Sequence, residues 1–221
     1  MSKYLIHTCP KRKWYVDEFL IPSMIDQNIQ RDDIQVYCDE AGDGHLMAFM
    51  NSWKMLKEQG TWHLQDDVII SSDFRRLTEA YDEGIVCGFV NSYSDSAGDI
   101  GYVSIDKMWY SMPCIRIPNE IMKDFVAWFV TSGVQEKYKI HIRNRKHSDV
   151  LFWDFLKEKY SDIKVLNLAP NLINHIDHLI GGSLINEKRN KGPEEIMSLY
   201  WNEPCLITQL EEELRRWNSE K

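Results

Sequence analysis

Two adjacent carboxylates, Asp66 and Asp67, interrupt an otherwise apolar stretch of the chain. Residues 62–65 and 68–70, on either side, have the apolar and β-branched character of strand sequence. Neighbouring carboxylates repel each other, and a folded chain tolerates this best when a cation lies between them or water covers them. Strand sequence on both sides disfavours easy solvation, so we expect a divalent metal with oxygen ligands. Phosphate oxygens usually complete such a site, so the pair predicts chemistry on a phosphorylated substrate.

The elements that must position these carboxylates alternate between strand and helix patterns. Strand patterns cover 3–8, 34–38, 62–70 and 85–90, and helix patterns cover 14–28, 45–59 and a segment that opens at 72–77. Pro22 is expected to kink or split the first of these helices. The βαβαβαβ order predicts an α/β fold whose parallel sheet binds ligands at the carboxyl ends of its strands.

The second part of the chain is less regular. We expect loops and short strands near 102–104 and 114–117, a helix over 119–131, a strand over 139–143, a helix from 148 to about 160, a strand over 164–168 and a loop over 170–185. A polar linker then leads to a last amphipathic helix after Pro204, whose apolar stripe consists of Leu206, Leu210, Leu214 and Trp217.

Composition narrows the protein class. With 221 residues the chain can bury a sizeable core, and its net charge of -8 argues against a dedicated nucleic-acid-binding protein. Its five cysteines include no CxxC pair, so we expect neither a zinc site nor a disulfide framework, as in a reducing cytoplasm. No apolar run is long enough to span a bilayer. A cytoplasmic protein without a transmembrane segment is therefore expected.

The order of motifs resembles a known family. A strand, a Pro/Arg loop, a helix, a strand that ends at Asp39 and a later strand with Gln65-Asp66-Asp67 resemble the nucleotide-sugar glycosyltransferases of the GT-A fold. The likeness is to the lipopolysaccharide-type group of bacterial and viral members. Gln65 stands where the acidic motif of that family usually begins with a carboxylate. Residues 170–177 and 182–185 are similar to its closing segment, where a histidine often completes the metal site.

The resemblance implies a GT-A (Rossmann-like) fold with a mixed, mainly parallel sheet flanked by helices in a single domain. That domain would cover residues 1–186, with a nucleotide-sugar-binding half over 1–90 and an acceptor half over 91–186. Residues 187–221 would form a C-terminal helical extension.

The implied activity is metal-dependent transfer of a sugar from a nucleoside diphosphate sugar to an acceptor hydroxyl on a glycan, a lipid-linked glycan or a hydroxymethylated DNA base. Asp67 and His175 would hold Mn²⁺ or Mg²⁺, and Asp149 would be the catalytic base of an inverting enzyme. The residues implied for donor binding are Thr8, Arg12, Asp39, Asn51 and Asp66.

Each of these residues also has a structural interpretation. The two aspartates could face solvent at a strand end, Arg12 could be a solvated base, and Asp39 could start a turn. Ser148 and Asp149 together could cap a helix, and Asp149 is not needed as a base if configuration is retained.

Two other functional classes remain open. A nucleotidyltransferase that makes nucleotide sugars would carry a glycine-rich phosphate loop after the first strand, and residues 8–12 contain no glycine. The other class is an interaction protein on a degenerate transferase fold, with the last helix as its partner surface. For the acceptor, residues 91–109 suit sugar binding, and the basic strip over 139–146 suits phosphates or a solvated edge strand. The donor sugar, its base and the oligomeric state are left undetermined.

Overall fold

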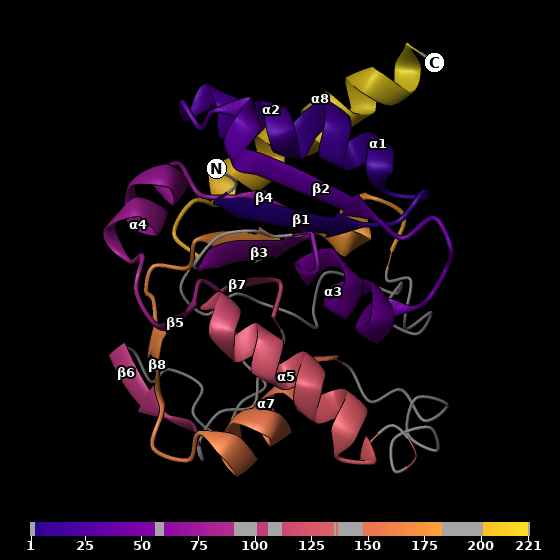
Figure 1. The fold of residues 1–221 in the computed structure, drawn as a ribbon. Coiled ribbons are helices and arrows are strands. Elements are labelled where there is room, and N and C mark those ends of the chain that lie inside the picture. The colour runs from indigo at the N-terminus through magenta and orange to yellow at the C-terminus, as the bar shows by residue number, and fades with distance from the viewer. Residues whose placement is uncertain are drawn as a thin grey trace.

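Helices cover both faces of a central sheet (Figure 1). The computed structural model describes residues 3–55, 60–90, 101–105, 112–134, 136, 148–182 and 201–220. The strands are β1 (Tyr4–Thr8), β2 (Ile34–Cys38), β3 (Thr61–Gln65), β4 (Val68–Ile70), β5 (Ile85–Cys87), β6 (Gly101–Ser104), β7 (Cys114–Ile117), β8 (Lys164–Asn167) and β9 (Ile173–His175). The α-helices are α1 (Lys13–Tyr15), α2 (Ile21–Asp26), α3 (His45–Trp53), α4 (Phe74–Ala80), α5 (Asn119–Thr131), α7 (Ser148–Lys159) and α8 (Pro204–Ser219). A π-helical segment η1 (Val16–Leu20) joins α1 to α2, and η2 (Arg31–Asp33) and η4 (Asp177–Leu179) are 3₁₀ turns.

The main sheet has the strand order β2-β1-β3-β7-β5-β8-β6. Strands β2, β1 and β3 are mutually parallel, and β8 is parallel to β5. Strand β7 is antiparallel to both β3 and β5, and the edge strand β6 is antiparallel to β8. Five of the seven strands therefore share one direction, which confirms the mixed, mainly parallel sheet. A separate antiparallel pair joins β4 to β9.

Two apolar cores lie on opposite faces of the sheet. All five residues of β1 are buried, as expected for a strand covered on both sides. Successive side chains of a strand point to opposite faces. Leu5 accordingly joins the core beneath α3, α5 and α7, while Tyr4 and Ile6 join the core beneath η1, α2, α4, α8 and the β4–β9 pair.

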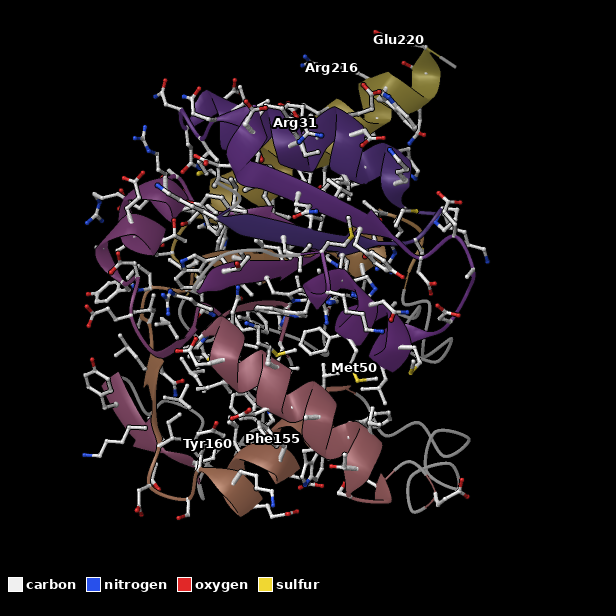
Figure 2. The ribbon with its side chains drawn as sticks, in the orientation of Figure 1. Arg31, Met50, Phe155, Tyr160, Arg216 and Glu220 are labelled. Carbon is white, nitrogen blue, oxygen red and sulfur yellow. The ribbon has the colours of Figure 1, made fainter. Side chains whose placement is uncertain are left out.

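Aromatic rings join α5 to α7 in the first core. Phe125 lies with its ring centroid 5.4 Å from those of both Phe152 and Phe155. Just beyond α7, Tyr160 donates its hydroxyl hydrogen to the Asp124 carboxylate, so this end of the helix pair is also tied by a polar contact (Figure 2).

The first helix is continuous but not uniform. Helical backbone runs from Lys13 to Asp26, close to the predicted range of 14–28, with the π-helical segment η1 in its middle. Pro22 lies two residues after the end of this segment, and proline lacks the N–H that an α-helix would donate to the carbonyl four residues earlier. The predicted irregularity at Pro22 is therefore present as a widened turn.

Several boundaries differ from the sequence prediction. Helix α3 ends at Trp53, earlier than the predicted end at 59, and residues 56–59 lie outside the described part. The predicted loop over 170–185 contains the strand β9 and the turn η4, because β9 pairs with a strand about a hundred residues earlier that no local pattern reveals. The predicted strand over 139–143 and the linker over 187–192 also lie outside the described residues.

The C-terminal helix α8 packs against the start of the chain. Leu210 and Leu214 are buried in the second core. Trp217 stacks on Trp14 with ring centroids 4.4 Å apart. At the other end of the helix, the Glu203 carboxylate accepts hydrogen bonds from the Ser72 backbone N–H at 3.0 and 3.2 Å. Within the described residues, no helix is both long and apolar enough to cross a membrane.

Candidate metal and nucleotide site

The ends of three neighbouring parallel strands meet at one edge of the sheet. Thr8 ends β1, Asp39 follows β2, and Asp66 follows β3. Strands β2 and β3 flank β1 in register, so these three residues must lie near one another. This edge, outside the carboxyl ends of the strands, is where open α/β sheets bind their ligands.

Asp66 and Asp67 lie in a bend, not within a strand. The continuous strand predicted over 62–70 is wrong, because β3 ends at Gln65 and β4 begins at Val68 in the other sheet. In a continuous strand, adjacent side chains would point to opposite faces of the sheet. The bend instead lets both carboxylates reach the same guanidinium, that of Arg12.

Arg12 is the central cation of this cluster. Its Nη1 donates to Asp66 Oδ1 at 3.1 Å and to Asp67 Oδ2 at 2.6 Å. Its Nη2 donates to the Gly182 carbonyl at 2.6 Å. Thr8 Oγ1 donates to the second oxygen of Asp66 at 2.8 Å. Both Asp66 oxygens therefore accept hydrogen bonds. The Arg12 side chain also joins the first loop to the Gly182 carbonyl, 170 residues later in the chain.

His175 completes the cluster from the other sheet. Strand pairing places it opposite Val68, directly beside Asp67. Its Nε2 lies 3.3 Å from Asp67 Oδ2, and its Nδ1 lies 3.4 Å from Asp177 Oδ1. Suitable ligand atoms of Asp67, His175 and Asp177 all lie within 4.8 Å of one another.

Burial and charge set the protonation of these groups. Burial and the neighbouring Asp67 carboxylate raise the pKa of Asp66 to about 6. Burial also opposes ionisation of Asp67, but His175 and Arg12 outweigh it and hold the pKa of Asp67 well below its ordinary value. Burial disfavours the imidazolium of His175 as well, yet Asp67 and Asp177 outweigh it and raise the pKa of His175 to about 10. These shifts favour the ionised form of Asp67 and the protonated form of His175.

One oxygen of the cluster is left without a hydrogen bond. Asp67 Oδ1 is buried and has no hydrogen-bond partner among the described residues. A buried carboxylate oxygen without a partner is costly, and a bound cation is one way to satisfy it. Carboxylate oxygens with one imidazole nitrogen form a donor set that suits Mn²⁺ or Mg²⁺. The residues present thus fit a divalent ion, which His175 would bind in its neutral form.

Two of the residues expected to bind the donor have structural partners. Asp39 accepts hydrogen bonds from the backbone N–H groups of Asp43 and Gly44, at 3.0 and 3.2 Å. It therefore shapes the loop between β2 and α3, as a turn-starting aspartate does. Asn51 donates to Asp43 Oδ2 at 3.2 Å and accepts from Lys54 Nζ at 2.8 Å. Neither side chain has a described contact with Arg12.

Asp149 lies in another part of the fold. It is in the first turn of α7, and its carboxylate accepts a hydrogen bond from the Val150 backbone N–H at 2.9 Å. No described contact links it to the Arg12 cluster, and its role as a catalytic base stays a prediction. The basic strip over 139–146 and most of the aromatic segment over 91–109 lie outside the described residues.

Two members of the cluster were not predicted. Asp177 stands two residues after His175, at the end of the segment 170–177 singled out in the sequence, but no role was predicted for it. Gly182 contributes only its carbonyl, which no sequence pattern could single out. The structure otherwise brings together five of the eight predicted site residues, namely Thr8, Arg12, Asp66, Asp67 and His175.

Comparison with known proteins gives low similarities. The sequence matches no protein-family model and no curated protein. The chain is similar to the apo-form glycosyltransferase GlyE from Streptococcus pneumoniae TIGR4, at 11% identity and a TM-score of 0.47, over 100% of this chain and 64% of that chain. This chain therefore spans less than two thirds of GlyE.

Two further solved structures show a similar degree of likeness. HddC from Yersinia pseudotuberculosis matches at 12% identity and a TM-score of 0.35, over 75% of this chain and 69% of that chain. A197 from STIV matches at 12% identity and a TM-score of 0.40, over 80% of this chain and 86% of that chain. Identities and TM-scores this low carry no residue roles across to this chain.

Proposed function

We propose that this chain is a glycosyltransferase that uses a divalent metal and a nucleoside diphosphate sugar. The observation that carries the proposal is the buried Asp67 oxygen without a hydrogen bond, grouped with His175 and Asp177 at the carboxyl ends of the strands. Asp67, His175 and Asp177 would hold the ion, Mn²⁺ or Mg²⁺. Once bound, the ion would stabilise the negative charge that develops on a diphosphate leaving group.

The chain's own residues supply the remaining electrostatics. Arg12 holds Asp66 and Asp67 in one orientation through its two ion pairs. Thr8 fixes the second oxygen of Asp66, so this carboxylate orients Arg12 and not the ion. Such prearranged groups need no reorganisation when charge develops on the leaving group.

The proposal also assigns acceptor binding to the second part of the catalytic domain. Residues 91–186 would bind an acceptor hydroxyl of a glycan or lipid-linked glycan, with a modified DNA base as the alternative. If the enzyme inverts configuration, Asp149 would accept the proton of that hydroxyl. Residues 187–221 would form an extension to the catalytic domain of residues 1–186.

The test is thermal stability with a panel of nucleoside diphosphates, with and without Mn²⁺. A ligand at about 100 times its dissociation constant adds roughly 2.7 kcal/mol, or about 5 °C or more for a chain of this size. We expect a metal-dependent shift with one nucleotide in the unmodified protein, and its loss in Asp67→Asn and Asp177→Asn. Asp162→Asn, which removes an exposed carboxylate, is the matched control and should keep the shift.

Other outcomes separate the alternatives. A shift that requires a nucleoside triphosphate and metal would favour a nucleotidyltransferase. No shift with any nucleotide would overturn the transferase proposal in favour of an interaction protein. A shift of equal size without metal would show that Arg12 and His175 bind the diphosphate directly.

A further inference from the structure

A cavity lies between the C-terminal helix and the first helix. It has a volume of about 560 Å³, within the range of ligand-binding pockets. Helix α8 forms one wall, η1 and α2 form the other, and β4 lies at the floor; α8 and α2 lie close together on this side of the sheet (Figure 1). Its apolar lining includes Tyr15, Phe19, Ile69, Ile70, Leu210 and Trp217.

The walls of this cavity are held firmly. The Trp14–Trp217 stack ties the far end of α8 to the first helix. Phe19 meets Trp217 edge-on with ring centroids 6.2 Å apart. Tyr15 donates its hydroxyl hydrogen to the Val68 carbonyl at 2.9 Å, which fixes the floor. These contacts fix the positions of the elements that line the cavity.

The rim carries an excess of negative charge. Its carboxylates belong to Glu18, Asp26, Glu213 and Glu220, and none of these forms an ion pair among the described residues. The lining contains one cation, Arg216, which lies 4.0 Å from Glu212; Arg216 and Glu220 both project from the outer end of α8 (Figure 2).

Carboxylates on the same helices but outside the cavity lining form ion pairs. Asp17 pairs with Lys13 on the first helix, and Glu211 pairs with Arg215 on α8. The same two helices thus neutralise carboxylates away from the cavity and leave those around it uncompensated. A cleft lined by one sign of charge concentrates ligands of the opposite sign.

The wall from Glu18 to Phe19 belongs to the π-helical segment η1. Such segments are rare and occur frequently at functional sites. This observation is independent of the charge of the rim.

We propose that this cavity binds a basic segment of a partner protein, in which lysine or arginine side chains alternate with apolar ones. The apolar side chains would lie on the floor beside Leu210 and Ile70. The cationic groups would face the rim carboxylates. This proposal does not depend on the transferase activity, because the partners of the Arg12 guanidinium, Asp66, Asp67 and Gly182, do not line the cavity.

The test measures binding of a capped, dye-labelled hexapeptide of alternating lysine and leucine by fluorescence anisotropy. We expect saturable binding that weakens as salt is added. The double variant Glu18→Gln/Glu213→Gln should weaken it about tenfold or more, since rim charges govern such attraction. The control Glu79→Gln/Asp162→Asn removes the same charge from other surfaces and should change it less than about twofold.

A competition experiment distinguishes peptide recognition from general attraction of positive charge. Spermidine, with as many positive charges as the peptide's lysines, should not displace the peptide at equal concentration. The proposal is overturned if spermidine displaces it, if both double variants weaken binding equally, or if no saturable binding occurs. All four substituted side chains are exposed or paired at the surface, so circular dichroism should show each variant folded.

Discussion

At the scale of single residues, Arg12 has the largest electrostatic role in the described structure. Its side chain is 5% exposed and forms ion pairs with two buried carboxylates. A buried ion pair is not by itself strong evidence of stability, but removal of one partner leaves an uncompensated buried charge. Here the substitution would remove the cationic partner of Asp66 and leave Asp67 with His175 alone.

Arg12→Met should therefore lower the free energy of unfolding by about 3–5 kcal/mol. Urea denaturation followed by tryptophan fluorescence would measure the loss. Arg76→Met is the matched control, because Arg76 pairs with Asp73 on the open surface of α4, and its urea midpoint should stay unchanged. Equal effects of the two variants would contradict the central role of Arg12.

At the scale of elements, Arg116 on β7 links the turns that lead into the neighbouring strands β3 and β5. Its Nη1 donates to the Gly84 carbonyl at 2.6 Å, just before β5. A Cβ on Gly60, just before β3, would lie 2.1 Å from Arg116 Nη2. The guanidinium thus fills the space that the missing side chain of Gly60 leaves open.

Gly60→Ala should destabilise the protein more than Gly84→Ala. Both glycines have positive φ, of +77° and +66°, so each substitution costs roughly 1–2 kcal/mol of backbone strain. Only at Gly60 must the guanidinium also move and lose its hydrogen bond, which adds about 1–3 kcal/mol. Thermal unfolding of both variants would measure the difference.

The control is a double-mutant cycle with Arg116→Met. In that background the extra cost of Gly60→Ala should disappear, because no guanidinium remains to be displaced. A cost that persists would trace the effect to the backbone of the turn and not to Arg116.

At the scale of the whole molecule, the two cores protect the centre of the sheet from solvent. Cys87 on β5 and Cys114 on β7 are buried, and burial raises the pKa of both thiols well above the ordinary value. Cys205, at the start of α8, is exposed. All five cysteines are free, in agreement with the expected absence of a disulfide framework.

A thiol reagent should therefore modify Cys205 of the native protein first. Cys87 and Cys114 should react only as fast as the whole protein unfolds, because each is buried in one of the two cores and the thiolate is the reactive form. Mass spectrometry of timed samples in increasing urea would follow each site. Rapid modification of Cys87 without urea would indicate that the sheet opens locally around β5.

The sequence by itself determined most of the elements and the end of the sheet at which the site lies. Period-two and helical patterns report local geometry, which explains why β1, β2, α5 and α8 were placed within a residue or two. The same patterns placed Thr8, Asp39 and Asp66 at strand ends. The apolar stripe of α8 was also correct, since Leu210 and Leu214 are buried.

Only the tertiary structure decided how the site is assembled. The insertion of β7 between β3 and β5, and the separate β4–β9 sheet, depend on pairing between distant segments. That pairing places His175 beside Asp67, and the bend before β4 turns both aspartates toward Arg12. Such contacts depend on side-chain packing across the whole chain, which local periodicity does not record. Most residues of the cluster were therefore predicted from the sequence. Their geometry, and the participation of Asp177 and the Gly182 carbonyl, became apparent only from the fold.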